Sequence, residues 1–156
     1  MSWGVKPPSV AEHATIELRR ITDVLQVEHA SLFLRDPEHP ERAVHVAETG
    51  VPLEEALAEH PRVIGRVLST GRVQEVEPRE GTREPIGSAL ATPLEHDGET
   101  VGALLVVSLR RNRRLGATDA QVIGRATETL VELTSRRGRS ERFTRDAKAS
   151  AMRDRR

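Results

Sequence analysis

The chain has 156 residues, 37% of them hydrophobic and 31% charged, a balance that suits one domain with a buried core and a solvated surface. It contains no cysteine, which excludes disulfides, thiolate catalysis, thiolate-bound zinc or iron–sulfur clusters, and thioether attachment of a pigment. No apolar run approaches the roughly 18 residues that span a bilayer, and no signal-peptide pattern opens the chain, so we expect a cytoplasmic protein without membrane association.

The net charge of zero is unevenly distributed along the chain. Residues 136–156 carry nine Lys and Arg against three Asp and Glu, about +6, and the remainder carries 15 against 21, about −6. We therefore expect an N-terminal arm over 1–8, a folded domain over 9–135 and a basic, flexible tail over 136–156. The tail is able to contact phosphates, so an accessory role on nucleic acid stays an alternative. Scarce aromatic residues and the lack of a groove-reading helix argue against sequence-specific binding.

The first predicted element is an amphipathic helix that ends near residue 25. Ser9 and Glu12 have the spacing of a capping box, in which each side chain satisfies a free backbone N–H at the start of a helix. The apolar stripe of the helix consists of Val10, Ala14, Leu18, Ile21 and Leu25.

Strands over 30–34 and 43–48 then flank a proline-containing turn, which predicts a hairpin.

A helical excursion is expected after the hairpin. Short helices are predicted over 52–59 and 63–70, with Pro61 ending the first and Gly71 in the left-handed position after the second. A brief strand over 73–76 follows them. The excursion leads away from the hairpin, so we expect it to cover a face of the sheet.

The strongest local signal is a second hairpin. Before it, residues 77–87 are polar, contain two prolines and two glycines, and predict a loop long enough to act as a lid. Apolar strands are predicted over 89–94 and 101–109. The Asp97-Gly98 pair between them is the favoured sequence for a tight hairpin turn.

The last predicted element is a second amphipathic helix over about 118–135, with Thr118 and Gln121 in the capping-box spacing. Strands joined by short turns make an antiparallel sheet, and two long helices must cover one face of it together. The sequence therefore predicts an α+β fold with an antiparallel sheet of five to six strands. The terminal helices are expected on one face, and the short helices and the lid loop on the other.

The chain resembles the GAF domain family over residues 9–135. Four segments carry the resemblance by their order and spacing: ASLFLRD at 30–36, AETG at 47–50, GRVLSTGRV at 65–73, and 88–109, with SALATPL and VGAL around Asp97-Gly98. The resemblance implies a stand-alone bacterial sensory or regulatory module. It also implies a small-molecule pocket between the sheet and the helical excursion, and a homodimer through the terminal helices. The related PAS domain is the second choice of fold.

Family motifs for particular ligands are missing. The pigment-attaching cysteine and the cysteines of the free methionine sulfoxide reductase branch have no counterpart, and the Asn-Lys-Phe-Asp-Glu pattern associated with cyclic-nucleotide binding is not found. We therefore expect no resident cofactor and name no ligand. A dimerisation or scaffold module with a filled pocket stays open as an alternative. Any signal is expected to pass to a partner protein.

Six polar residues are candidates for lining the pocket. Arg79 and Arg83 would clamp an anionic group, and two hydroxyls from a strand end would add hydrogen bonds. The alternative is a solvated polar loop, in which these arginines pair with neighbouring glutamates at little net gain. The candidates are His45, Glu48, Arg79, Arg83, Ser88 and Thr92.

Enzymatic chemistry is not expected. The six histidines are scattered, without the i, i+4 pair that places two ligands on one helical face, so no metal site is predicted. The chain has no Gly-x-Ser-x-Gly nucleophile motif and no phosphate loop ending in Gly-Lys-Ser/Thr. The predicted function is a non-enzymatic sensor.

Overall fold

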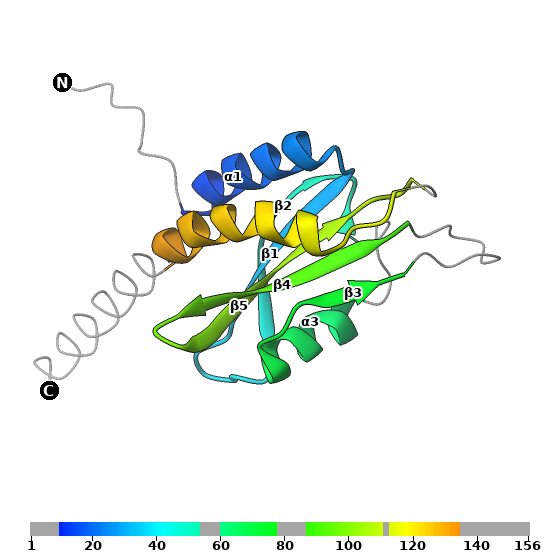
Figure 1. Cartoon of the computed structure of the whole chain (residues 1–156). Helices are drawn as coiled ribbons and strands as arrows, with labels where there is room; N and C mark the ends of the chain where they lie inside the picture. The colour runs from blue at the N-terminus through cyan, green and yellow to red at the C-terminus, as the bar shows by residue number, and fades with distance from the viewer. Residues whose placement is uncertain (1–9, 54–59, 78–86, 111–112, 135–156) are drawn as a thin grey trace, which may run out of the picture.

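The computed structural model describes residues 10–53, 60–77, 87–110 and 113–134 (Figure 1). The predictions for the N-terminal arm, most of the first short helix, the proposed lid and the basic tail lie outside these residues, as does Ser9 of the first capping box. Within the described ranges, no helix is long and apolar enough to cross a membrane.

One antiparallel sheet of five strands forms the centre of the domain. The strand order is β2-β1-β5-β4-β3, so β2 and β3 are the edges and β5 lies in the middle. All neighbouring pairs are antiparallel, which confirms the predicted α+β fold. The strands are β1 (His29–Arg35), β2 (Ala43–Gly50), β3 (Gln74–Val76), β4 (Ala89–His96) and β5 (Glu99–Val107).

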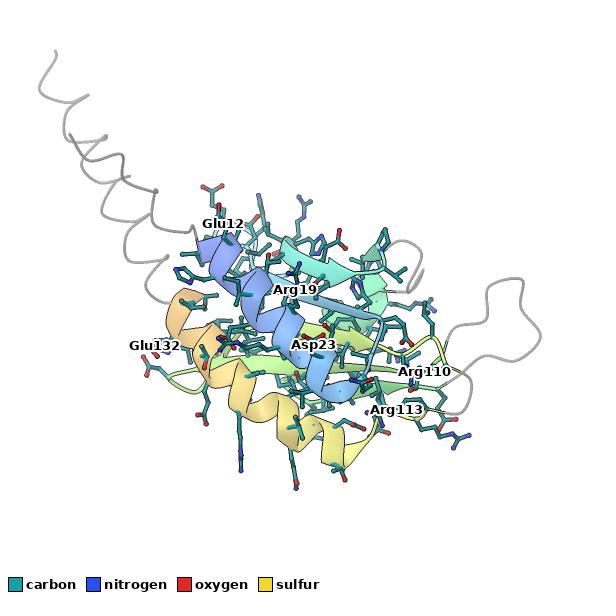
Figure 2. All side chains as sticks on the ribbon, turned by 90° about the horizontal axis from the view of Figure 1, so that it is seen from above. Glu12, Arg19, Asp23, Arg110, Arg113 and Glu132 are labelled. Atoms are coloured by element: carbon teal, nitrogen blue, oxygen red, sulfur yellow. The ribbon has the colours of Figure 1, made fainter. Side chains whose placement is uncertain are left out.

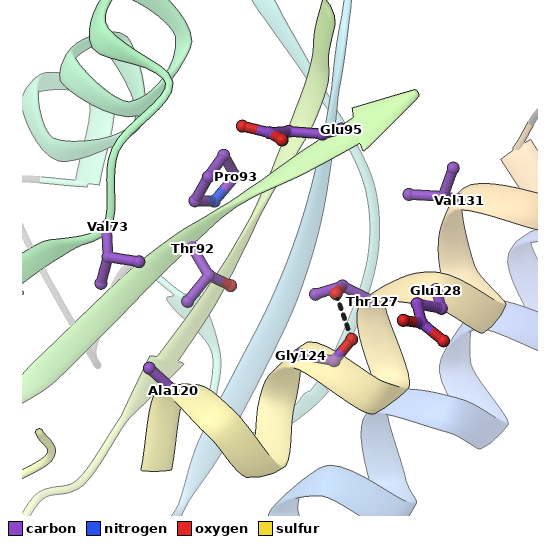
Figure 3. Close-up of a pocket in the computed structure, with 9 residues that line it drawn as sticks. All are labelled: Val73, Thr92, Pro93, Glu95, Ala120, Gly124, Thr127, Glu128 and Val131. Carbon is purple, nitrogen blue, oxygen red and sulfur yellow. Dashed lines mark hydrogen bonds between the residues drawn. The ribbon is translucent and has the colours of Figure 1, made fainter. Parts of the chain in front are cut away.

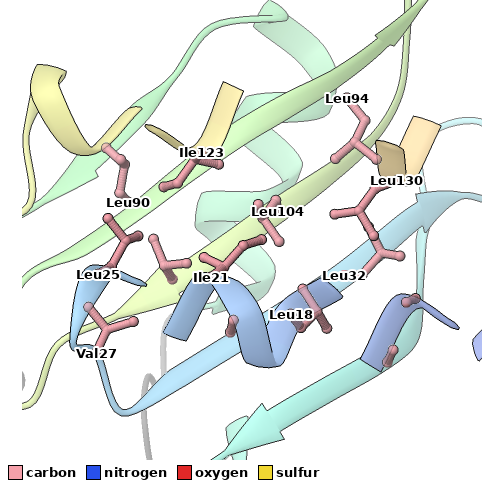
Figure 4. Packing of buried hydrophobic residues seen from close by; sticks show 14 of the residues in the cluster. Leu18, Ile21, Leu25, Val27, Leu32, Leu90, Leu94, Leu104, Ile123 and Leu130 are labelled. Atoms are coloured by element: carbon pink, nitrogen blue, oxygen red, sulfur yellow. The ribbon is translucent and has the colours of Figure 1, made fainter. Parts of the chain in front are cut away.

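Two antiparallel helices cover one face of the sheet, as predicted. They are α1 (Val10–Leu25) and a helix over residues 117–134, which is called the C-terminal helix below. Figure 2 shows Glu12 and Glu132 at one end of this helical layer and Arg113 at the other. Apolar side chains from both helices and the sheet pack together between the layers (Figure 4). They include Leu18, Ile21, Leu90, Leu104, Ile123 and Leu130.

The opposite face of the sheet carries α3 (His60–Thr70), which packs over β4 and β5. The sheet presents Ala89, Ala91 and Ala103 to this helix, and these small side chains let the helix approach the strands closely. Pro61 was expected to end a preceding helix, but it lies in the first turn of α3. A proline fits there because the first N–H groups of a helix have no partner within it.

Left-handed residues end α1 and α3 and form the second hairpin turn. The chain leaves α1 through Gln26, which has a φ of 56°, and Val27 N–H donates to the Thr22 carbonyl over 3.1 Å. Gly71 has the predicted left-handed conformation after α3, with a φ of 65°. Asp97 and Gly98 have φ values of 51° and 80°, which confirms the predicted tight turn.

The predicted cap of the C-terminal helix is wrong by a few residues. The helix begins at residue 117, so Thr118 lies inside its first turn. Gly116 supplies the first helical acceptor, and Asp119 Oδ2 accepts the Gly116 N–H over 2.9 Å. A carboxylate is favoured in this position because it is a strong acceptor next to the positive end of the helix dipole.

Arg113 fastens the start of the C-terminal helix to the end of α1 (Figure 2). Its Nη2 donates to the Leu25 carbonyl over 3.0 Å and to Asp119 Oδ1 over 2.9 Å. The two helices are therefore joined by hydrogen bonds as well as by their shared apolar core.

Candidate functional site

The face that carries α3 is apolar beneath this helix but bears polar side chains over β1 and β2. His45 of β2 is exposed and stacks on Phe33 of β1, with ring centroids 4.9 Å apart and planes inclined by 24°. The two residues meet because they are direct partners in the strand register. Phe33 is buried in the core that includes α3, which places His45 on the same face.

Glu48 lies on this face and connects β2 to the helical excursion. Its Oε2 accepts the backbone N–H of Leu53 over 3.1 Å, at the point where the chain becomes helical after β2. Leu53 is buried in the core beneath α3. A ligand that contacts Glu48 would therefore act directly on the start of the excursion.

A buried pair on β1 was not predicted as part of the site. His29 and Ser31 are both fully buried, and His29 Nε2 is hydrogen-bonded to the Ser31 hydroxyl. His29 Nδ1 lies 2.5 Å from the Val51 carbonyl oxygen. Because that oxygen only accepts, Nδ1 is assigned as the donor to it. Side chains two residues apart along a strand point to the same face, so the spacing of His29, Ser31 and Phe33 would have predicted both residues on this face.

The six predicted pocket residues do not form one cluster. His45 and Glu48 lie on the α3 face of the sheet. Ser88 and Thr92 lie on the opposite face. Arg79 and Arg83 lie outside the described residues. One small ligand cannot contact both described pairs, because the sheet separates them. In the described ranges, no group of three or more His, Asp or Glu is arranged to hold a metal ion.

Hydrogen bonds of Ser88 link the segment before the C-terminal helix to the start of β4. Its hydroxyl donates to the Arg113 carbonyl over 2.7 Å and accepts the Leu115 N–H over 2.9 Å. Leu115 belongs to the core beneath the terminal helices. The Ser88 hydroxyl therefore already has both a donor and an acceptor partner within the domain.

Thr92 lines a hollow of about 430 Å³ between β4 and the C-terminal helix (Figure 3). The residue is only 5% exposed, and its hydroxyl has no hydrogen-bond partner among the described residues. The lining also includes Val73, Pro93, Glu95, Ala120, Gly124, Thr127, Glu128 and Val131. This hollow and the polar area around His45 lie on opposite faces of the sheet.

The family model described as the GAF domain matches residues 9–129, which is most of the chain. The chain belongs to the GAF domain family. Among curated proteins, no sequence matches this GAF domain.

Solved structures with the same fold come from several kinds of protein. The GAF domain from an Acinetobacter phosphoenolpyruvate-protein phosphotransferase is 16% identical, with a TM-score of 0.69 over 88% of this chain and 89% of that chain. The GAF-B domain of DevS from Mycobacterium smegmatis is 17% identical, with a TM-score of 0.63 over 86% and 99%. A free methionine-R-sulfoxide reductase from Neisseria meningitidis, in complex with its substrate, is 16% identical, with a TM-score of 0.61 over 82% and 79%. At such identities the likeness concerns the fold alone.

Proposed function

We propose that this GAF domain is a non-enzymatic, cytoplasmic sensor that binds a small molecule over β1 and β2, on the α3 face of the sheet. The observation that carries the proposal is the exposed His45, stacked on Phe33 and on the same face of the sheet as Glu48, beside the apolar core beneath α3. Small-molecule sites combine an apolar wall with a few placed polar groups, and these residues supply both.

The contacts of β1 and β2 suggest how such binding would be transmitted. Glu48 holds the start of the excursion through Leu53, so a ligand that competes for this carboxylate would shift the excursion. Leu32 of β1 points to the other face and packs in the core beneath the terminal helices. A ligand produces a signal only if it binds two states of the domain with different affinity. The output would then pass to a partner protein or through a homodimer of the terminal helices.

The similarity to a methionine sulfoxide reductase raises an enzymatic alternative. The chain contains no cysteine, so a reductase step that uses a protein thiol is not open to it. We therefore keep binding as the proposed use of the fold. A scaffold without a ligand is one alternative, and it predicts that no compound stabilises the domain. An accessory role on nucleic acid through the basic tail is the other.

A thermal-shift screen of the full chain tests the proposal. The panel contains nucleotides, cyclic nucleotides, amino acids and organic acids. A ligand at about 100 times its Kd stabilises a folded protein by about 2.7 kcal/mol, so at least one compound is expected to raise the Tm by several degrees. His45→Ala should reduce that shift, whereas His39→Ala, in the exposed turn between β1 and β2, should leave it unchanged. A panel without any shift, or equal losses in both variants, would contradict the proposal.

A further inference from the structure

We propose that the hollow between β4 and the C-terminal helix is a second binding site, which takes a small organic cation with an ammonium group. The hollow lies across the sheet from His45 and Glu48, so it is distinct from the site of the proposed function. Figure 3 shows residues of β4 on one side of it and residues of the C-terminal helix on the other.

The unpaired hydroxyl of Thr92 is the first observation that points to a ligand. Thr92 is 5% exposed, and its Oγ1 is the buried side-chain polar atom that lacks a partner in the described part of the chain. Such a group destabilises the fold unless something binds it. The hydroxyl is directed toward the C-terminal helix near Gly124 and Thr127 (Figure 3).

Within the described residues, the edge of β4 beside the hollow has no partner strand. β5 pairs with β4 from Ala89 to His96, whereas β3 pairs only with residues 89–91. The next stretch of this edge therefore faces the hollow, and it contains Pro93. Proline has no N–H, so Pro93 adds no backbone donor at this edge.

Three polar side chains of the lining, those of Glu95, Thr127 and Glu128, offer acceptors only. Glu95 and Glu128 are its only charged residues, and neither forms an ion pair within the described ranges. The Thr127 hydroxyl donates to the Gly124 carbonyl over 2.7 Å, so its oxygen remains available only as an acceptor. A ligand must supply the donors, and an ammonium group supplies three together with a positive charge.

The walls of the hollow fit a short alkyl chain attached to this ammonium. Val73, Ala120 and Val131 are apolar. Gly124 adds no side chain to the helix wall, and a Cβ added there would meet no atom within 4 Å. A ligand with a charged head and a small apolar body would thus bury its chain against the helix. Its head would lie toward the carboxylates.

Nuclear magnetic resonance of the full chain tests the site with n-butylammonium as the probe. The neutral n-butanol and the anionic butyrate have similar alkyl chains and serve as matched probes. We expect saturable amide shifts at Thr92, Gly124 and Thr127 with n-butylammonium. The other two probes should bind with a Kd at least about tenfold higher. Equal affinities for the three probes, or n-butylammonium shifts confined to β1 and β2, would overturn the proposal.

Variants of the lining give an independent test. Glu128→Gln should weaken n-butylammonium binding about tenfold, because a charge-assisted hydrogen bond becomes a neutral one. Glu132→Gln, one turn further along the same helix and outside the lining, is the matched control and should leave the Kd unchanged. Gly124→Leu should fill the hollow and abolish binding; if that variant folds poorly, the comparison of the two glutamine variants decides. Equal effects of Glu128→Gln and Glu132→Gln would rule out a site-specific ammonium contact.

Discussion

Ser88 and Thr92 are two buried hydroxyl residues near one end of the same strand face, yet their surroundings differ. The Ser88 hydroxyl both donates and accepts within the domain, whereas the Thr92 hydroxyl has no partner in the described structure. Net stabilisation by a buried hydrogen bond is modest, but an unpaired buried group carries the full cost of its lost hydration. The two residues should therefore affect stability in opposite directions.

Thr92→Val should raise the free energy of unfolding by about 1 kcal/mol, because valine keeps the shape and removes the unpaired hydroxyl. Ser88→Ala should lower it by about 2 kcal/mol, because it leaves the Leu115 N–H and the Arg113 carbonyl without their partner. Urea unfolding of the full chain, followed by circular dichroism, measures both. If Thr92→Val were as destabilising as Ser88→Ala, Thr92 would have a hydrogen-bond partner that the structure does not show.

The sequence predicted Ser88 and Thr92 at a strand end, as candidates for a pocket between the sheet and the helical excursion, but both lie on the side of the C-terminal helix. Ser88, Leu90 and Thr92 share a face by alternation, and Leu90 and Leu94 fill the core beneath the long helices. The intervening Ala89 and Ala91 face α3. The larger apolar residues thus marked the side of the larger helices. Strand alternation alone could not settle the face, because a sequence does not state which layer covers which side.

At the scale of the elements, local chemistry determined what could be predicted. The Asp97-Gly98 turn and the Gly71 helix end were predicted correctly because their conformations depend on neighbouring residues alone. The cap at Asp119 was missed, since this carboxylate is also held by Arg113, whose other hydrogen bond runs to the end of α1. Long-range contacts of this kind are invisible to a local pattern.

Gly124 and Gly71 differ in whether the structure requires a glycine at their position. Gly124 lies inside the C-terminal helix, where an added Cβ meets no atom within 4 Å, so Gly124→Ala should raise the free energy of unfolding by about 1 kcal/mol through helix propensity. Gly71 has a φ of 65°, and its added Cβ would lie 3.1 Å from Thr100 Oγ1. Gly71→Ala should therefore lower the same quantity by about 1 kcal/mol. Chemical denaturation of both variants checks this, and stabilisation by Gly71→Ala would contradict the assigned conformation.

At the scale of the molecule, the helical layer presents apolar side chains to solvent as well as to the sheet. Ile16 and Val24 of α1 are 49% and 67% exposed, and Val122 of the C-terminal helix is 41% exposed. The sheet buries one stripe of each helix, so these residues lie outside the core that the chain forms by itself. An expected homodimer through the terminal helices would bury them.

Sedimentation velocity tests this dimer. The full chain is expected to sediment as a dimer at micromolar concentrations, and the double variant Ile16→Glu with Val24→Glu as a monomer. The reason is that burying each large apolar side chain contributes about 2 kcal/mol, whereas burying an unpaired carboxylate opposes association. Val44→Glu, at a residue of β2 with a similar exposed fraction of 49%, is the matched control and should leave the dimer intact. A wild-type chain that sediments only as a monomer would contradict the expected pairing. Dissociation by Val44→Glu would instead place the contact at the β2 edge of the sheet.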